Sequence, residues 1–162
     1  MVVAVIGLLS GIVLVSLNNA RMKARDAKRL QDVRQLITAL SLYYENNGRY
    51  PCHSGSNSLQ NTFLQPLITS GLMASTPRDP TNTIANEMYY SYQSYRTAVG
   101  GPCGQIAHLD ISFENPPANG CPSGVMVNPI HCHVFIPAAP SCPGGYVHDA
   151  CSSALLDDAN EW

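Results

Sequence analysis

The sequence predicts an α+β protein in which one long N-terminal helix packs on a small antiparallel sheet, within a disulfide-stapled C-terminal region. Two observations predict this fold class. Residues 1–47 contain no proline, whereas all twelve prolines and all six cysteines lie at residue 51 or later. The candidate strands follow the helix as a group, which is typical of α+β proteins. We therefore divide the chain into a helix over 1–47 and a globular domain over 48–162, which is large enough for one core.

The first half of the predicted helix, residues 1–19, is apolar on all sides. No charged side chain occurs between Met1 and Leu17, as expected for a helix surrounded by lipid or by other apolar helices. Such a run rises about 25 Å, which is less than the ~30 Å hydrocarbon core of a bilayer. The helical pattern continues without a small-residue cleavage site, which argues against a signal peptide. We expect that the sequence begins inside the apolar segment and that a few residues precede Met1.

The second half of the predicted helix, residues 20–47, is amphipathic. Its apolar residues recur at steps of three and four, the spacing of one helix face. We expect five of them to form the packing surface for the sheet: Leu30, Val33, Ile37, Leu40 and Tyr44. The helix should end near Asn47, because Gly48 tolerates the left-handed conformation and Pro51 prevents the helix from resuming.

The domain that follows is predicted to hold one short helix and three or four strands. The helix is expected over Leu59–Ser70, kinked or split at Pro66. Alternation of polar and apolar residues, together with aromatic content, marks the strand candidates. They are Met88–Tyr95, Gln105–Phe113, Gly124–Asn128 and His131–Ile136. A helical turn is expected in the tail, around Ala150–Asp157.

The cysteines are even in number and confined to the domain, which predicts a disulfide framework formed in an oxidising compartment. They are Cys52, Cys103, Cys121, Cys132, Cys142 and Cys151. Six cysteines allow fifteen pairings, and the sequence does not choose among them. No CxxC pair and no CxxCH motif occurs, so we expect neither a cysteine-bound metal nor a haem, and no other cofactor.

The candidate metal ligands with a shared geometry are His131 and His133, which flank Cys132 on one predicted strand. They would share a strand face, as ligands of one ion must. No third ligand is identifiable, and Cys132 is expected in a disulfide, so we predict no metal site. We also predict no catalytic residue and no enzyme, because a cysteine nucleophile needs a free thiol and the even count leaves none.

Charge is unevenly distributed along the chain. Residues 1–34 carry six basic and two acidic side chains, whereas the remainder carries three basic and nine acidic ones. The acidic domain is a poor candidate for general nucleic-acid binding. The basic cluster after Leu17 creates a conflict. It would be placed in the cytoplasm by the positive-inside rule, while the disulfides require the domain to be outside.

Three segments of the chain occur in an order that is familiar from one protein family. They are VVAVIGLLSGIVLVSLNNARMKARDAKR, then YYENNGRYP at the helix exit, then TPRDPTN before the first strand. Over its first half the chain resembles type IV pilins and the related type II secretion pseudopilins. The family's start, Phe-Thr-Leu-Ile-Glu or similar, is absent, so its glutamate has no counterpart here. The acidic, Gly-rich calcium loop of pseudopilins is also absent, since Cys142–Ala150 contains only Asp149. This difference favours a pilin.

The resemblance implies a bacterial precursor with a short basic leader, which would resolve the charge conflict. The mature chain would be held in the inner membrane and then packed by an assembly machinery into a homopolymeric filament at the cell surface. No nucleic acid is expected on the shaft. Two alternatives remain open: a type II secretion pseudopilin, and a single-pass anchored binding or adhesion domain that does not polymerise.

Two groups of helix residues would carry such assembly. The filament core is expected from Val5, Ile6, Gly7, Leu8, Leu9, Gly11, Ile12, Val13, Leu14 and Val15. A charge belt is expected between the core and the outer domains, where ion pairs between subunits would set the register. Its members are Arg21, Lys23, Arg25, Asp26, Lys28 and Arg29. The alternative for this belt is an ordinary solvated or headgroup-facing surface.

Overall fold

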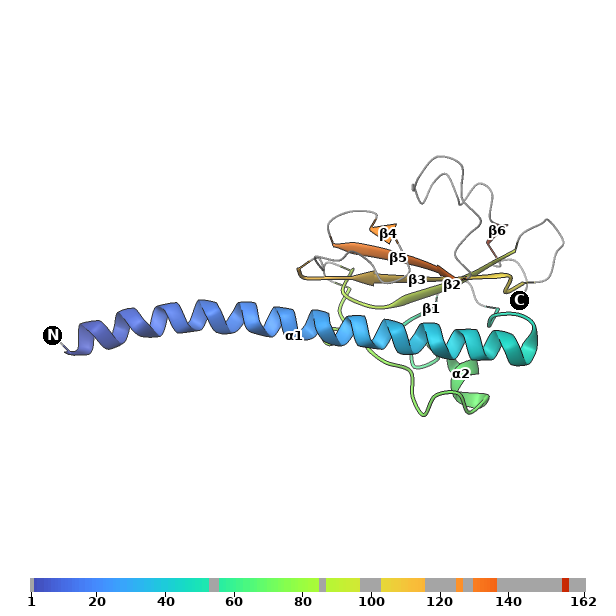
Figure 1. The fold of residues 1–162 in the computed structure, drawn as a ribbon, viewed down its shortest axis with the longest axis horizontal. Coiled ribbons are helices and arrows are strands. Elements are labelled where there is room, and N and C mark those ends of the chain that lie inside the picture. Colours follow the sequence, from blue (N-terminus) through green and yellow to red (C-terminus); the bar gives the residue numbers. More distant parts are fainter. Residues whose placement is uncertain are drawn as a thin grey trace.

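The computed structural model is an α+β protein with a long N-terminal helix laid along an antiparallel sheet (Figure 1). The structure describes residues 2–52, 56–84, 87–96, 103–115, 125–126, 130–136 and 156–157. The predicted α+β class, with a long N-terminal helix packed on an antiparallel sheet, is confirmed.

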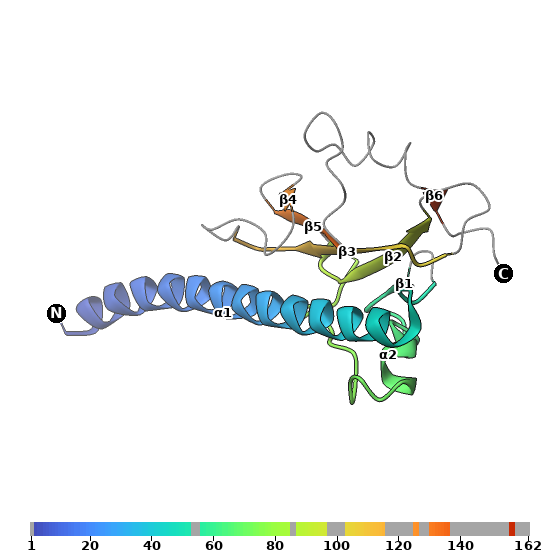
Figure 2. The same ribbon diagram turned by 45° about the vertical axis from the view of Figure 1, so that its right-hand side comes forward.

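Helix α1 spans Val2–Asn47 without interruption. At 1.5 Å per residue its 46 residues extend about 69 Å. The sheet lies over its C-terminal half, and its N-terminal half projects beyond the domain (Figures 1 and 2). The helix ends as predicted. Gly48 adopts a φ of 69°, and its N–H donates to the carbonyl of Tyr44 at 2.7 Å, which satisfies an end-of-helix acceptor.

The sheet is antiparallel throughout its described part. Its strand order is β1-β2-β3-β5-β4, and β6 pairs with β2 beside this path. Three strands are long and three have only two residues. The strands are β1 (Ser56–Asn57), β2 (Ser91–Arg96), β3 (Ile106–Ser112), β4 (Val125–Met126), β5 (His131–Ile136) and β6 (Leu156–Asp157).

The strand predictions hold best where alternation was strongest. β5 has the predicted bounds, and β3 is one residue shorter at each end than predicted. β2 begins only at Ser91, because Met88 forms an isolated bridge with Thr83 instead of joining the ladder. The predicted tail helix is wrong at its described end, where Leu156–Asp157 is a strand that pairs with β2. The rest of that prediction lies outside the described residues.

The predicted helix over Leu59–Ser70 is also too long. Only Gln65–Thr69 is helical (α2), and Leu64 before it has a left-handed φ of 46°. Pro66 lies in the first turn of α2, where a missing N–H has no helical acceptor to lose. The proline therefore starts the helix and does not kink it. In both views α2 lies on the other side of α1 from the sheet.

The hydrophobic core forms between α1 and the inner face of the sheet. The fully buried apolar residues described in α1 are Val33, Leu36 and Leu40, and they meet Leu109 and Val134 of β3 and β5 in one cluster. Burying each such side chain contributes about 1.5 to 3 kcal/mol. This cluster holds the C-terminal half of α1 on the sheet.

The predicted packing stripe of α1 needs a correction. Val33 and Leu40 are buried, but Leu30 and Ile37 are only partly buried against the core. Tyr44 is 40% exposed, and its ring lies on Tyr50, with ring centroids 4.7 Å apart, instead of on the sheet. Leu36, which the sequence predicts to widen the stripe, is fully buried. The buried face also includes Arg29 and Ala39, which the three-and-four spacing of apolar residues did not select.

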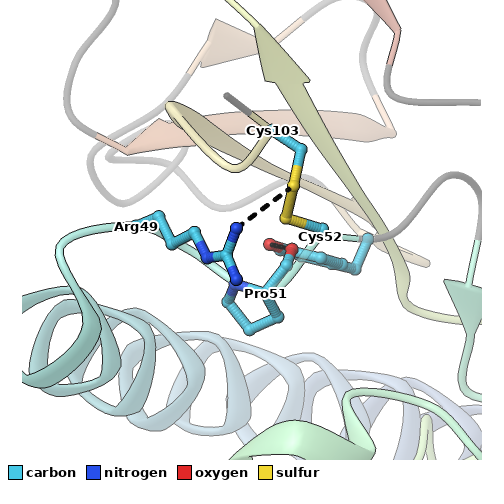
Figure 3. The surroundings of a disulfide bond; sticks show 5 residues. Arg49, Pro51, Cys52 and Cys103 are labelled. Carbon is cyan, nitrogen blue, oxygen red and sulfur yellow. Dashed lines mark hydrogen bonds between the residues drawn. A yellow bond between two sulfur atoms is a disulfide. The ribbon is translucent and has the colours of Figure 1, made fainter. Parts of the chain in front are cut away.

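A disulfide between Cys52 and Cys103 joins the exit of α1 to the start of β3, with the Cα atoms 5.5 Å apart (Figure 3). The guanidinium of Arg49 lies against it, with Nη1 3.9 Å from the sulfur of Cys103. Cys132 is also disulfide-bonded. Cys121, Cys142 and Cys151 lie outside the described residues.

Beside this disulfide, Gly104 has a φ of 72° and accepts a 2.8 Å hydrogen bond from the N–H of Tyr50. A Cβ at Gly104 would overlap the backbone carbonyl of Tyr50. We expect Gly104→Ala to lower the free energy of unfolding by about 2 to 3 kcal/mol in urea denaturation. Gly71→Ala is the matched control, because its φ is also 72° but its Cβ would enter open space. It should lose only about 1 kcal/mol, and equal losses would contradict the steric argument.

Candidate functional site

The projecting half of α1 exposes apolar side chains. Val3 is 83% exposed, Ile6 58% and Leu17 44%. Of the predicted filament-core residues, Ile6 is the one whose side chain the structure describes. Within the described part of the chain, no helix combines the length and hydropathy needed to cross a bilayer.

Where the projecting half meets the domain, a fully buried arginine lies at the centre of an ion-pair network. Arg29 is 0% exposed, although it belongs to the amphipathic half of α1. Its Nε and Nη2 donate to the two carboxylate oxygens of Asp79 at 2.6 and 3.0 Å. Its Nη1 donates to Asp26 at 2.7 Å and to Glu114 at 2.9 Å, and Nη2 also reaches the hydroxyl of Thr81 at 3.1 Å. All three nitrogens of the guanidinium are therefore satisfied.

The acidic partners of Arg29 are themselves held from several directions. Arg25 forms a two-point ion pair with Glu114, at 2.6 and 2.5 Å. The Asp26 carboxylate accepts the backbone N–H of Glu114 at 3.0 Å and that of Asn115 at 2.7 Å. One turn of α1 thus fixes the loop that follows β3. We call Arg25, Asp26, Arg29, Asp79, Thr81 and Glu114 the Arg29 network.

The network shifts the acid–base properties of its members. Burial alone would raise the pKa of Asp79, but the hydrogen bonds from Arg29 and Thr81 outweigh burial and lower that pKa. The hydrogen bond from Arg25 lowers the pKa of Glu114 in the same direction. For Arg29, burial alone would lower the pKa, but its carboxylate partners outweigh burial and raise that pKa above its ordinary value. The charged forms of all these groups are the stable ones at neutral pH.

The remaining members of the predicted charge belt lie closer to solvent. Lys28 pairs with Asp32 at 2.6 Å, and Asp32 accepts the hydroxyl hydrogen of the buried Tyr90 at 2.9 Å. Arg21 and Lys23 are exposed, and the described residues provide no ion-pair partner for either.

The structure changes the interpretation of the belt. Arg25, Asp26, Lys28 and Arg29 form ion pairs inside one chain. Arg29 leaves the predicted inter-subunit set altogether, because its buried side chain has no surface for a neighbouring subunit. The acidic partners Asp79 and Glu114 lie 50 and 85 residues away in sequence, so helix spacing alone did not predict them.

A second polar cluster lies on the face of the sheet away from α1. His108 and Asp110 are two residues apart on β3, and His133 of β5 lies directly opposite Asp110. His108 Nε2 is 2.9 Å from His133 Nδ1 and 2.9 Å from Asp110 Oδ1, while His133 Nδ1 is 2.7 Å from the same oxygen. We call these three residues the histidine cluster.

The electrostatics of this cluster favour a carboxylate. Burial would raise the pKa of Asp110, but the imidazoles of His108 and His133 outweigh burial and lower it well below its ordinary value. His108 is fully buried, whereas His133 is partly exposed. The cluster therefore combines a carboxylate oxygen with two imidazole nitrogens at a site that is not sealed.

The sequence prediction found only one member of this cluster. His133 belongs to it, but His131 does not: its Nδ1 lies 2.9 Å from the hydroxyl of Ser112, and its Nε2 lies 3.5 Å from the carboxylate of Glu87. The signal that was missed is the His-x-Asp of β3. It becomes informative only with the register that places Asp110 opposite His133.

Comparisons with protein-family models, with curated proteins and with solved structures found no match. The resemblance to type IV pilins therefore stays a prediction from the sequence. Any function has to be argued from the residues of this chain.

Proposed function

We propose that this chain is the structural subunit of an extracellular helical filament of the type IV pilus kind. The observation that carries the proposal is the projecting half of α1, whose apolar side chains are exposed by 83% at Val3 and 58% at Ile6. Apolar side chains exposed to this extent on a projecting helix need a partner that covers them. A second copy supplies an identical apolar helix, and further copies extend the contact along an axis.

Close approach of such helices depends on small residues. Gly7 and Gly11 are four residues apart and therefore lie on one face of α1, with Ser10 beside them. Small residues at this spacing let the backbones of two apolar helices come into contact. When a helix moves from lipid to an equally apolar filament core, the hydrophobic effect contributes little, and close packing supplies the association energy. The domain, attached to the other half of α1, would form the filament surface.

The proposal is tested by changing one exposed apolar residue in the projecting half. Ile6→Asp should reduce filament yield at least tenfold, because a carboxylate in an apolar helix core costs about 2.5 kcal/mol or more. The measurement is negative-stain electron microscopy of the full chain after detergent removal, with filament mass quantified by sedimentation. The wild-type chain is expected to form long filaments of uniform width.

Ile84→Asp is the matched control for this test. Ile84 is 76% exposed, but it lies in the domain and not on the projecting half of α1. Its filament yield should equal that of the wild type. Discrete wild-type particles that never elongate would overturn the filament proposal in favour of an anchored domain, and short, self-limited assemblies would favour a pseudopilin. Filaments of Ile6→Asp at wild-type yield would also contradict it.

A further inference from the structure

The histidine cluster has the layout of a metal site. Its residues come from two hydrogen-bonded strands, with His108 and Asp110 on β3 and His133 on β5. Side chains directly opposite each other on an antiparallel pair, and those two residues apart on one strand, lie close together on one face. The backbone register alone therefore brings these three side chains together. They form the one group of three metal-ligating side chains found among the described residues.

The distances between the ligand atoms fit a coordination shell. His108 Nε2, His133 Nδ1 and Asp110 Oδ1 form a triangle with edges of 2.9, 2.9 and 2.7 Å. Metal–ligand bonds of about 2.0 to 2.2 Å place neighbouring ligand atoms roughly 2.8 to 3.1 Å apart at right angles, and about 3.4 Å apart in a tetrahedron. Small side-chain shifts of about half an ångström would satisfy either geometry.

One oxygen of the triangle is compensated by the two imidazoles without a well-directed hydrogen bond. Asp110 Oδ1 is buried and has no partner with hydrogen-bond geometry, although two imidazole nitrogens lie close to it. Such a carboxylate oxygen needs a compensating donor or cation. A metal ion bonded to the same two imidazoles would also compensate it.

The outer contacts of His108 orient its ring in the cluster. The hydroxyl of Tyr95 donates to Gln93 Oε1 at 2.7 Å and lies 3.4 Å from His108 Nδ1. A metal ion bound at His108 Nε2, the atom that faces Asp110 and His133, would require the ring hydrogen to be on Nδ1, next to that hydroxyl.

We infer that His108, Asp110 and His133 bind one divalent transition-metal ion of the zinc class. Two imidazole nitrogens and one carboxylate oxygen suit zinc and its neighbours in the first transition row, whereas calcium and magnesium prefer shells made of oxygen. Cys132, the residue before His133, is disulfide-bonded and faces the core side of β5, so the site contains no thiolate from it. Three protein ligands leave room for a further exchangeable one.

Calorimetric titration of the full-length, tag-free chain with zinc chloride tests this inference. The chain should be treated with a chelator first and kept free of reductant, so that no cysteine thiol competes for zinc. The wild-type chain should bind about one zinc ion per chain. Asp110→Asn and His133→Gln should each weaken binding by more than about 100-fold, because the first removes the negative charge of one ligand and the second removes an imidazole nitrogen.

His131→Gln is the matched control. His131 is on the same strand and the same face as His133, two residues away, but it lies outside the triangle. Its zinc affinity should stay within about twofold of the wild type. An equal loss in His131→Gln and His133→Gln would overturn the inference, as would the absence of saturable zinc binding by the wild type.

Cobalt(II) gives a readout that does not depend on variants, which matters if a substitution prevents folding. The wild-type chain loaded with one cobalt ion should show ligand-field absorption that one equivalent of zinc removes. A cobalt spectrum identical to that of the aqueous ion would overturn the inference, whatever the variants do.

Discussion

Arg29→Met is expected to lower the free energy of unfolding by about 3 to 5 kcal/mol. Methionine fills much of the space of the arginine stem but removes every hydrogen bond to Asp79, Asp26 and Glu114. Asp79 is only 4% exposed, so its charge would remain buried without a counter-ion. Chemical denaturation monitored by circular dichroism measures the loss.

Two controls separate the buried charge from a general effect of mutating α1. Arg34→Met removes an exposed arginine of the same helix and should change stability by less than about 0.5 kcal/mol. In the double variant Arg29→Met/Asp79→Asn the stranded charge is gone, so its loss should be smaller than the sum of the two single losses. Strict additivity would show that Arg29 and Asp79 do not act as a pair.

The single variant Arg29→Met should also alter the pH dependence of stability. In the wild type the folded-state pKa values of Asp79 and Glu114 are lowered, so the stability that they contribute is complete above their unfolded pKa values, near 4. It is lost as the pH falls through the lower, folded values. Without Arg29, the folded Asp79 takes up a proton more readily. The difference in stability between wild type and Arg29→Met should therefore shrink as the pH falls below about 4, and a constant difference would contradict this mechanism.

Removing the Cys52–Cys103 disulfide is expected to cost about 4 kcal/mol, the loop-closure value for cysteines 51 residues apart. The double variant Cys52→Ser/Cys103→Ser is required, because a single substitution would leave a thiol that can exchange with other disulfides. Urea denaturation measures the change in midpoint and slope. An increased slope would accompany the loss, since the denatured chain becomes more expanded without the cross-link.

Arg49→Met is the local control for the disulfide variant. It removes the guanidinium beside the Cys103 sulfur, as drawn in Figure 3, and leaves the covalent bond in place. Arg49 is exposed, so the expected change is below about 0.5 kcal/mol. A loss in the double variant of less than about 1 kcal/mol would mean that the packing of α1 on the sheet, and not the cross-link, holds this end of the helix.

Local chemistry determined the parts of the fold that could be predicted. The end of α1 at Asn47 follows from Gly48, and the bounds of β5 follow from the turn residues that flank it. The effect of Pro66 was predicted wrongly because a proline can either interrupt a helix or begin one. The left-handed backbone of Leu64, two residues earlier, shows that Pro66 belongs to the first turn of α2. The tail contains too few apolar residues for their spacing to distinguish a turn of helix from a strand of two residues.

The candidate sites depended on contacts that local patterns do not contain. Arg29 was identified as charged and helical, but its burial requires Asp79 and Glu114 from two distant loops. The histidine cluster likewise requires the pairing of β3 with β5, in which a shift of one residue would turn Asp110 to the opposite face from His133. Alternation of polar and apolar residues predicts which side chains of a strand share a face. It does not predict which residue of a neighbouring strand lies opposite each of them.

The Arg29 network also ties α1 to the domain near the base of the projecting half, where Arg25 and Asp26 bind the loop after β3. The helix extends about 35 Å from Arg25 to Val2. Over that length a tilt of about 10° would displace the N-terminal tip by about 6 Å, more than the rise of one helical turn. The three carboxylates around the Arg29 guanidinium oppose such a tilt, together with the core contacts of α1.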